Sequence, residues 1–180
     1  MAGNQFKTDE LGGRSFSATY TTEQYPLGTT ALQLSDDVNA ESGVAITVTD
    51  ATWNKLGGDR EWVFVYAKTE ITAGYLCEWD FDHGIAYAVD PATTADQIVN
   101  TIAGVADNDI AAGSYGWIIK RGVCVVKAAS DVATAGEPLA SSGNDGEVDD
   151  DGAAGTCVGV AIDTVGLVAA SHVQAYISVP

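Results

Sequence analysis

Basic residues are scarce in this sequence. Only 8 of its 180 residues are lysine or arginine, against 25 aspartates and glutamates, which gives a formal net charge of −17. Nucleic-acid affinity rests largely on contacts of lysine and arginine with phosphates, so this balance excludes DNA and RNA as partners. Hydrophobic residues nevertheless make up 46% of the chain and charged residues 18%. We therefore expect a globular protein rather than a disordered acidic tail.

Cysteines and long apolar runs are also few. Cys77, Cys124 and Cys157 are far apart, odd in number and in no C-x-x-C spacing, which argues against a disulfide framework or a zinc site and favours buried free thiols. No stretch approaches the roughly 18 apolar residues of a membrane span. The N-terminus lacks a basic region followed by an apolar run. We therefore predict a protein made in the cytoplasm that has no membrane partner.

Catalytic motifs are missing as well. The segment Asp80-Phe-Asp-His-Gly84 sets Asp80 and Asp82 beside His83, which allows a hydrolase or a metal site, but a strand end followed by glycine favours a turn with solvated acids. We find no zinc-protease, phosphate-loop, serine-hydrolase or dinucleotide-binding motif. The sequence therefore predicts that the protein is not an enzyme and uses no cofactor.

The densest run of acids is Asn144-Asp-Gly-Glu-Val-Asp-Asp-Asp-Gly152. An EF-hand loop that began at Glu147 would need a glutamate at its twelfth position, where Val158 stands. We interpret the run as a solvated acidic loop and predict no bound metal, with a looser surface calcium site as the alternative. The acidity continues beyond it, because no lysine or arginine follows Lys127.

Residues 1–30 differ from the rest. They are polar, rich in Thr, Ser and Gly, and show neither helical nor strand periodicity. Their spaced aromatic residues are Phe6, Phe16, Tyr20 and Tyr25. Because such side chains suit docking on a neighbour's surface, we predict an extended N-terminal arm whose aromatic residues form an interface. A disordered leader is the alternative.

Residues 31–180 are expected to form one all-β domain. Residues 43–50 alternate apolar and polar side chains, and residues 61–68 are apolar on both faces, which predicts a central strand. Further segments rich in β-branched and aromatic residues are 76–81, 85–89, 102–105, 115–120, 123–128, 157–162 and 173–179. Only 91–100 has a weak helical pattern, and it could equally be a loop. Many short strands with Gly-rich turns predict a single β-barrel or β-sandwich.

A short turn pattern recurs. Residues 70–74, 109–113 and 131–136 each place an acid, a β-branched residue, small residues and a glycine before a new strand. We expect the glycine to take a positive φ and the β-branched side chain to fill the edge of the core. A different turn is predicted at Lys120-Arg121-Gly122, as a hairpin whose Lys120 and Arg121 form a basic tip that could bind a neighbouring subunit.

Several of these segments together resemble a known family. Residues 104–127 read GVADNDIAAGSYGWIIKRGVCVVK and continue into VATAGEPL, then GEVDD and VGVAI, while WVFVYAK and ITAG lie upstream. This order resembles the capsid decoration, or cement, proteins of tailed bacteriophages, which are small β-barrels, over roughly residues 60–180. The resemblance implies a structural virion protein, often a homotrimer, that binds the major capsid protein on the outer capsid surface and stabilises the head lattice. High negative charge agrees with that role, because it keeps subunits soluble before assembly and disfavours a place beside packaged DNA.

The principal alternative is a carbohydrate-binding or host-attachment module of a virion. Its motivation is the presence of Trp53, Trp62, Trp79 and Trp117, since exposed aromatic rings stack on sugars. Trp62 and Trp117 lie in predicted strands, where packing in the core is the better interpretation. Trp53 follows a predicted strand and is the best candidate for an exposed ring.

Overall fold

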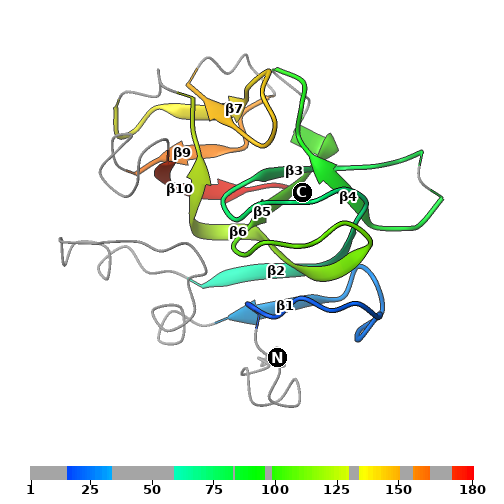
Figure 1. The fold of residues 1–180 in the computed structure, drawn as a ribbon. Helices are drawn as coiled ribbons and strands as arrows, with labels where there is room; N and C mark the ends of the chain where they lie inside the picture. Colours follow the sequence, from blue (N-terminus) through cyan, green and yellow to red (C-terminus); the bar gives the residue numbers. More distant parts are fainter. Residues whose placement is uncertain are drawn as a thin grey trace.

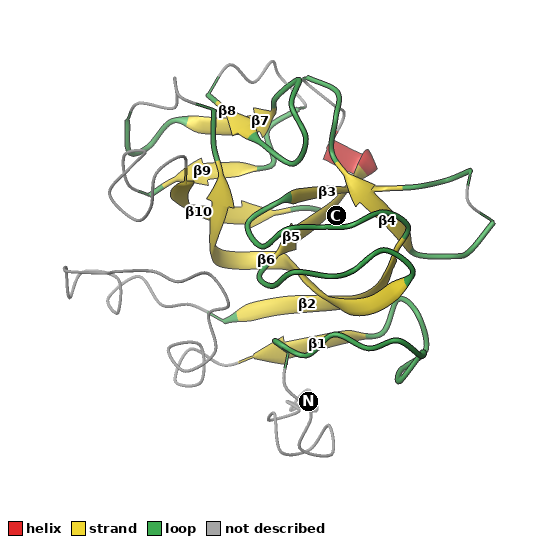
Figure 2. Cartoon of the chain, viewed as in Figure 1, coloured by secondary structure: helices red, strands yellow, loops and turns green. Residues whose placement is uncertain are grey.

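A computed structural model describes residues 16–33, 59–82, 84–95, 99–129, 134–150, 156–162 and 172–180. The all-β prediction is confirmed: the described residues form one ten-stranded sheet and a short 3₁₀ helix, Val99–Thr101 (Figure 2). The strands are β1 (Thr30–Gln33), β2 (Arg60–Ala67), β3 (Leu76–Trp79), β4 (Ala88–Pro91), β5 (Ile102–Ala106), β6 (Ser114–Lys127), β7 (Pro138–Ser141), β8 (Val148–Asp149), β9 (Gly159–Ala161) and β10 (His172–Ser178). The strand predicted at 43–50 lies outside the described residues. No described helix is long and apolar enough to cross a membrane.

The sheet returns onto itself through one strand. The strand order is β1-β2-β4-β3-β5-β6-β10-β9-β7-β8, and an additional pairing joins β2 to β6 (Figure 1). This pairing closes a ring of β2, β4, β3, β5 and β6, in which only the contact of β2 with β4 is parallel. Strands β10, β9, β7 and β8 form a second, smaller loop, which a parallel bridge between Ala128 and Val148 brings back to the end of β6. Strand β1 pairs with β2 alone. The architecture is therefore neither a regular barrel nor two separate sheets.

Strand β2 is the central strand that the sequence predicts. It pairs with β1, β4 and β6, and six of its eight residues are buried. Two hydrophobic clusters lie on the two faces of this region. The buried residues of one cluster are non-aromatic, such as Val63, Val65 and Cys77, and the other cluster contains the large rings of Trp62 and Phe64. The unbroken apolar and aromatic run at residues 62–67 of β2 is explained by this arrangement, because both faces of the strand are covered.

The hairpin predicted at Lys120-Arg121-Gly122 is wrong. Residues 114–127 form one continuous strand, β6, which pairs with β2 in its first half and with β10 in its second. Gly122 has φ 121°, and a Cβ there would meet the carbonyl oxygen of Asp59 at 2.8 Å. The glycine therefore lets the strand change partners without turning back, whereas a sequence pattern alone cannot distinguish this bend from a turn.

The recurrent turn pattern is confirmed in its first two copies. Ile71 and Ile110 are fully buried and form a bridge with each other, with N···O distances of 2.9 and 2.8 Å. Gly74 and Gly113 end the two turns with φ 86° and 75°. The two copies thus pair side by side at one end of the ring, which explains why both carry an isoleucine at the same place. Part of the third copy lies outside the described residues.

One charged pair is buried near the bend in β6. The side chains of Arg60 and Asp107 are each 1% exposed, with 3.9 Å between Nη1 and Oδ2. Arg60 also donates a hydrogen bond from Nε to the carbonyl oxygen of Val123 at 2.7 Å. This pair ties the start of β2 to the loop after β5 and to β6.

Candidate functional site

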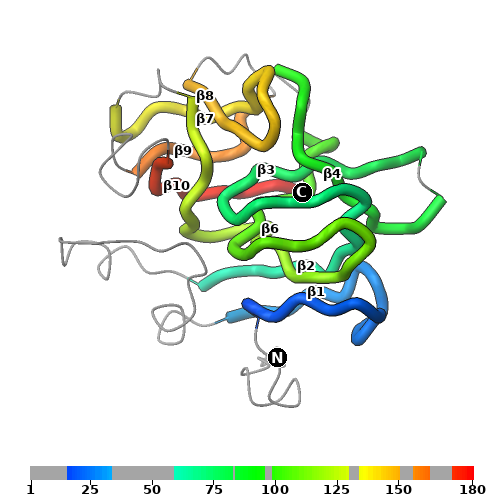
Figure 3. The backbone as a smooth tube through the Cα atoms, in the orientation of Figure 1, coloured from blue at the N-terminus to red at the C-terminus, as the bar shows by residue number. Residues whose placement is uncertain are grey.

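The described part of the predicted arm packs on the chain's own sheet. The ring of Phe16 is 2% exposed and stacks on Trp62 at 4.9 Å between centroids. Tyr20 and Tyr25 pack around Phe64 at 6.1 and 5.2 Å. The tube in Figure 3 shows this segment, in blue, running beside β2. Phe16, which we expected to contact a neighbour, therefore has almost no surface to offer one in this conformation, and Phe6 lies outside the described residues.

Backbone hydrogen bonds fix the same segment in place. Tyr20 and Tyr115 form a bridge with N···O distances of 2.8 and 2.7 Å. Gly28 donates to the carbonyl oxygen of Phe64, and Phe64 donates to that of Thr29, both at 2.9 Å. Because the segment also adds strand β1 to the sheet beside β2, residues 16–33 belong structurally to the same core as the strands that follow.

Lys120 and Arg121 face different surroundings. Lys120 lines a groove beside Trp79 and Tyr87, whereas Arg121 is exposed and donates from Nε to the hydroxyl oxygen of Tyr176 at 3.1 Å. That hydrogen bond is the main reason that the pKa of Arg121 is raised. The two basic residues therefore do not act as one basic tip.

Arg121 belongs instead to an exposed row that crosses several strands. Tyr176 of β10 lies opposite Val160 of β9, which lies opposite Pro138 of β7. Val160 is 41% exposed and Tyr176 39%. We call Arg121, Tyr176, Val160 and Pro138 the cross-strand row. Large exposed apolar side chains that adjoin in this way are more typical of a contact surface than of a solvated face.

The acids near β3 and β4 make a structural ion pair. Lys68 Nζ lies 2.9 Å from Asp80 Oδ2 and 3.2 Å from Asp90 Oδ2, and these contacts raise the pKa of Lys68, with the hydrogen bond to Asp80 as the largest cause. Asp80 also accepts from the backbone N–H of Asp82 at 3.0 Å. Asp80 is thus held by lysine rather than solvated as expected, while His83 lies outside the described residues.

The predicted acidic loop is also partly engaged. Glu147 pairs with Lys127 at 3.0 Å and accepts from the side-chain amide of Asn144 at 2.9 Å. Residues 151 and 152 of the run lie outside the described residues. Within the described ranges, no group of three or more His, Cys, Asp or Glu side chains is placed to hold a metal ion.

Two of the three cysteines are buried as predicted. Burial raises the pKa of Cys77 and of Cys124 to about 12, so both stay protonated at neutral pH. Cys157 is exposed instead, since it precedes β9 rather than lying within it.

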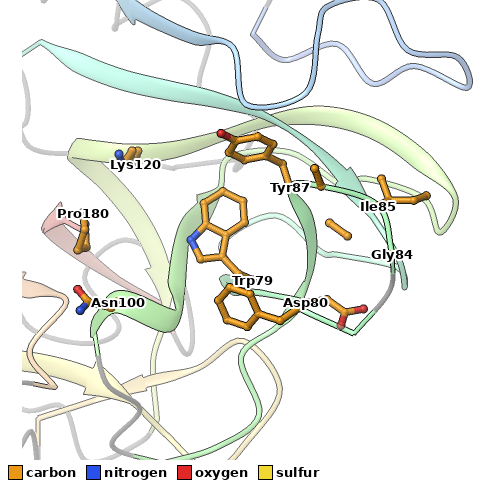
Figure 4. Close-up of a pocket in the computed structure, with 11 residues that line it drawn as sticks. Trp79, Asp80, Gly84, Ile85, Tyr87, Asn100, Lys120 and Pro180 are labelled. Carbon is orange, nitrogen blue, oxygen red and sulfur yellow. The ribbon is translucent and has the colours of Figure 1, made fainter.

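An open groove of about 590 Å³ lies beside the loop between β3 and β4. Its main lining side chains are Trp79, Phe81, Ile85, Tyr87, Asn100 and Lys120. Trp79 and Tyr87 meet edge to face at 5.6 Å between centroids. Figure 4 shows the nitrogen-bearing edge of the Trp79 indole turned toward the side where Asn100 and Pro180 lie, with Lys120 above them in this view. Phe81 is 74% exposed and Tyr87 48%. We call this site the aromatic groove.

Sequence reasoning missed the aromatic groove. It placed the exposed tryptophan at Trp53, which lies outside the described residues, and it correctly predicted that Trp62 and Trp117 are buried, at 1% and 2% exposure. The signal that could have found the groove is the spacing of Trp79, Phe81 and Tyr87 around a glycine-containing loop. Alternate residues of a strand project to the same face, so Trp79 and Phe81 were candidates to share one.

Comparison with known proteins finds a likeness of fold. No family model matches the chain, and no curated protein matches it. Among solved structures, the fold is similar to that of the head fibre gp8.5 N base of bacteriophage phi29. The match covers 65% of this chain and 92% of that chain, with a TM-score of 0.50 and 22% sequence identity. The likeness is one of fold.

Proposed function

We propose that this chain is a non-enzymatic structural protein of a bacteriophage virion that binds the outer surface of the head and stabilises the capsid lattice. The observation that carries the proposal is the likeness of fold to a head fibre base, which spans 92% of that base. The resemblance of residues 60–180 to capsid decoration proteins supports the same role from the sequence.

Physical properties of the chain agree with attachment to an exterior surface. A net charge of −17 keeps a subunit soluble before it meets the lattice and disfavours a place against packaged DNA. The pairing of β2 with β6 closes five of the ten strands into a ring, and each strand of that ring has a partner on both sides, which protects it from aggregation through an open edge at high copy number. A rigid, soluble module of this kind suits a protein that is added to an assembled shell.

We place the contact with the major capsid protein on the cross-strand row. It combines apolar area at Val160 and Tyr176 with the guanidinium of Arg121, which the hydroxyl of Tyr176 orients. Aromatic and arginine side chains contribute a large share of the binding energy at protein interfaces. The surface is supplied by paired strands rather than by loops, so its shape is fixed before binding.

We further propose that the protein acts as a homotrimer. A symmetric oligomer would present several copies of the cross-strand row to the lattice at once, and linked weak contacts gain strength through effective concentration. Light scattering on the purified protein, and on the protein released from capsids, measures the number of subunits.

The test is binding of the purified full chain to expanded capsids that lack it. We expect co-sedimentation with the capsids and a higher temperature of capsid disruption. Val160→Asp and Tyr176→Ala should each weaken binding by about tenfold or more, because they remove or charge the exposed apolar area. Phe81→Ala, which removes an exposed ring from the aromatic groove, is the matched control and should bind as the unaltered chain does.

Two results would contradict the proposal in different ways. If the chain fails to bind capsids at any ionic strength, attachment to the head is wrong. If the unaltered chain binds and Val160→Asp and Tyr176→Ala bind capsids as well as it does, attachment to the head is supported but the cross-strand row is not the contact surface.

A further inference from the structure

The aromatic groove has no part in the proposed attachment to the capsid. It lies beside the loop between β3 and β4, whereas the cross-strand row runs over β7, β9, β10 and one residue of β6. Its volume of about 590 Å³ falls within the range of small-ligand pockets. We propose that the aromatic groove binds a neutral carbohydrate.

Charge on the groove argues for a neutral ligand. Its lining contains one acid, Asp80, and one base, Lys120. The carboxylate of Asp80 is in addition compensated by Lys68, at 2.9 Å. An anionic ligand would meet the field of a chain whose net charge is −17, and a cationic ligand would meet Lys120, so neither sign of charge is favoured.

The side-chain chemistry argues for a sugar. Phe81 and Tyr87 expose apolar ring surface in the same groove where Asn100, Lys120 and the indole N–H of Trp79 supply polar groups. A pyranose ring has an apolar face of C–H groups that packs on an aromatic ring, and a rim of hydroxyls that exchange hydrogen bonds. A wholly apolar ligand, such as an alkyl chain, would use the rings but leave the polar groups of the groove without a partner, which costs binding energy.

A backbone hydrogen bond and a close packing contact fix the positions of the residues that flank Phe81 and Tyr87. Asp80 donates its backbone N–H to the carbonyl oxygen of Ala88 at 2.9 Å, which closes the loop. Tyr87 has φ 59°, a backbone conformation that is uncommon for a residue with a large side chain. Its ring lies directly over Gly28, where any Cβ would collide with it. Unusual backbone conformations that the surroundings enforce cluster at ligand sites, because the surface is then arranged before the ligand arrives.

The experiment uses the full chain and a panel of neutral di- to tetrasaccharides built from glucose, galactose, mannose or N-acetylglucosamine. Saturation-transfer NMR detects binding, and tryptophan fluorescence gives the affinity. We expect at least one member to bind, and Phe81→Ala to weaken that binding by about tenfold or more. Because Phe81 is 74% exposed, this variant should fold normally, and thermal denaturation verifies that it does.

Further variants and probes separate the alternatives. Trp79→Ala should also weaken binding, whereas Tyr176→Ala, which removes a partly exposed ring elsewhere, should leave it unchanged. Sialylated forms of the bound sugar should bind no better than the neutral form. The proposal is overturned if no neutral oligosaccharide binds at about 10 mM, if Phe81→Ala and Trp79→Ala both bind as the unaltered chain does, or if an apolar peptide occupies the groove in place of sugar. Capsid binding is measured on the same variants, so failure here is distinguishable from failure of the proposed function.

Discussion

Replacing Phe16 by alanine tests whether residues 16–33 belong to the folded core. The Phe16 ring is 2% exposed, stacks on Trp62 at 4.9 Å and meets Trp117 edge to face at 5.3 Å. Truncation of a buried phenylalanine costs about 3–5 kcal/mol of unfolding free energy, through lost burial and the cavity that remains. The loss should lower the melting temperature by roughly 6–20 °C, given about 2–4 °C per kcal/mol for a chain of this size.

The measurement is denaturant unfolding followed by tryptophan fluorescence, which reports directly on the two rings that Phe16 contacts. Phe81→Ala is the matched control, because it makes the same chemical change at a side chain that is 74% exposed, and it should cost within about 0.5 kcal/mol. Deletion of residues 1–28 should destabilise the fold more than Phe16→Ala does, since it also removes Tyr20 and Tyr25. If Phe16→Ala and Phe81→Ala are equally stable, the segment does not anchor on its own sheet and the reasoning is refuted.

Three further predictions concern the buried ion pair and the cysteines. Asp107→Ala should lower the free energy of unfolding by roughly 3–5 kcal/mol, because it leaves the Arg60 charge buried without its partner. Adding Arg60→Met should recover most of that loss, as measured by denaturant unfolding. A double variant as unstable as the single one would contradict this prediction. Alkylation at neutral pH should label Cys157 but not Cys77 or Cys124 in the folded protein, with mass spectrometry counting the modified thiols. Burial raises the pKa of the two buried thiols from 9.0 to about 12, so above pH 9.0 the folded protein keeps thiol protons that the unfolded chain loses. The free energy of unfolding should therefore fall as the pH rises above 9.0, by up to about 1.4 kcal/mol per pH unit for each thiol. Replacing both with alanine should flatten that slope.

Much of the fold could be predicted from local pattern. Runs rich in apolar, β-branched and aromatic residues identified β2, β3, β5, β9 and β10 to within a few residues, because strand propensity is a property of the segment itself. The conformation of the two isoleucine turns also follows from local chemistry, because each turn ends in a glycine that takes a positive φ. These features depend on neighbours in sequence, which a single chain displays.

What could not be predicted depends on contacts between distant residues. Gly122 appears as a turn in the sequence, yet β2 and β10 pair on its two sides and hold the strand extended. The aromatic residues of the first thirty positions suggest docking, but only the sheet decides that Phe16 docks on its own chain. Likewise the aromatic groove needs Lys120 and Asn100 to come beside Trp79, and no spacing in the sequence encodes that approach.

Attachment to the outside of a phage head is the central claim, and a cryo-electron microscopy reconstruction tests it most directly. Expanded capsids that lack this protein are imaged before and after addition of the purified full chain. We predict additional density on the outer surface that accommodates the sheet, with the cross-strand row toward the shell. Capsids that look identical before and after addition, or density on the interior surface, would contradict the account.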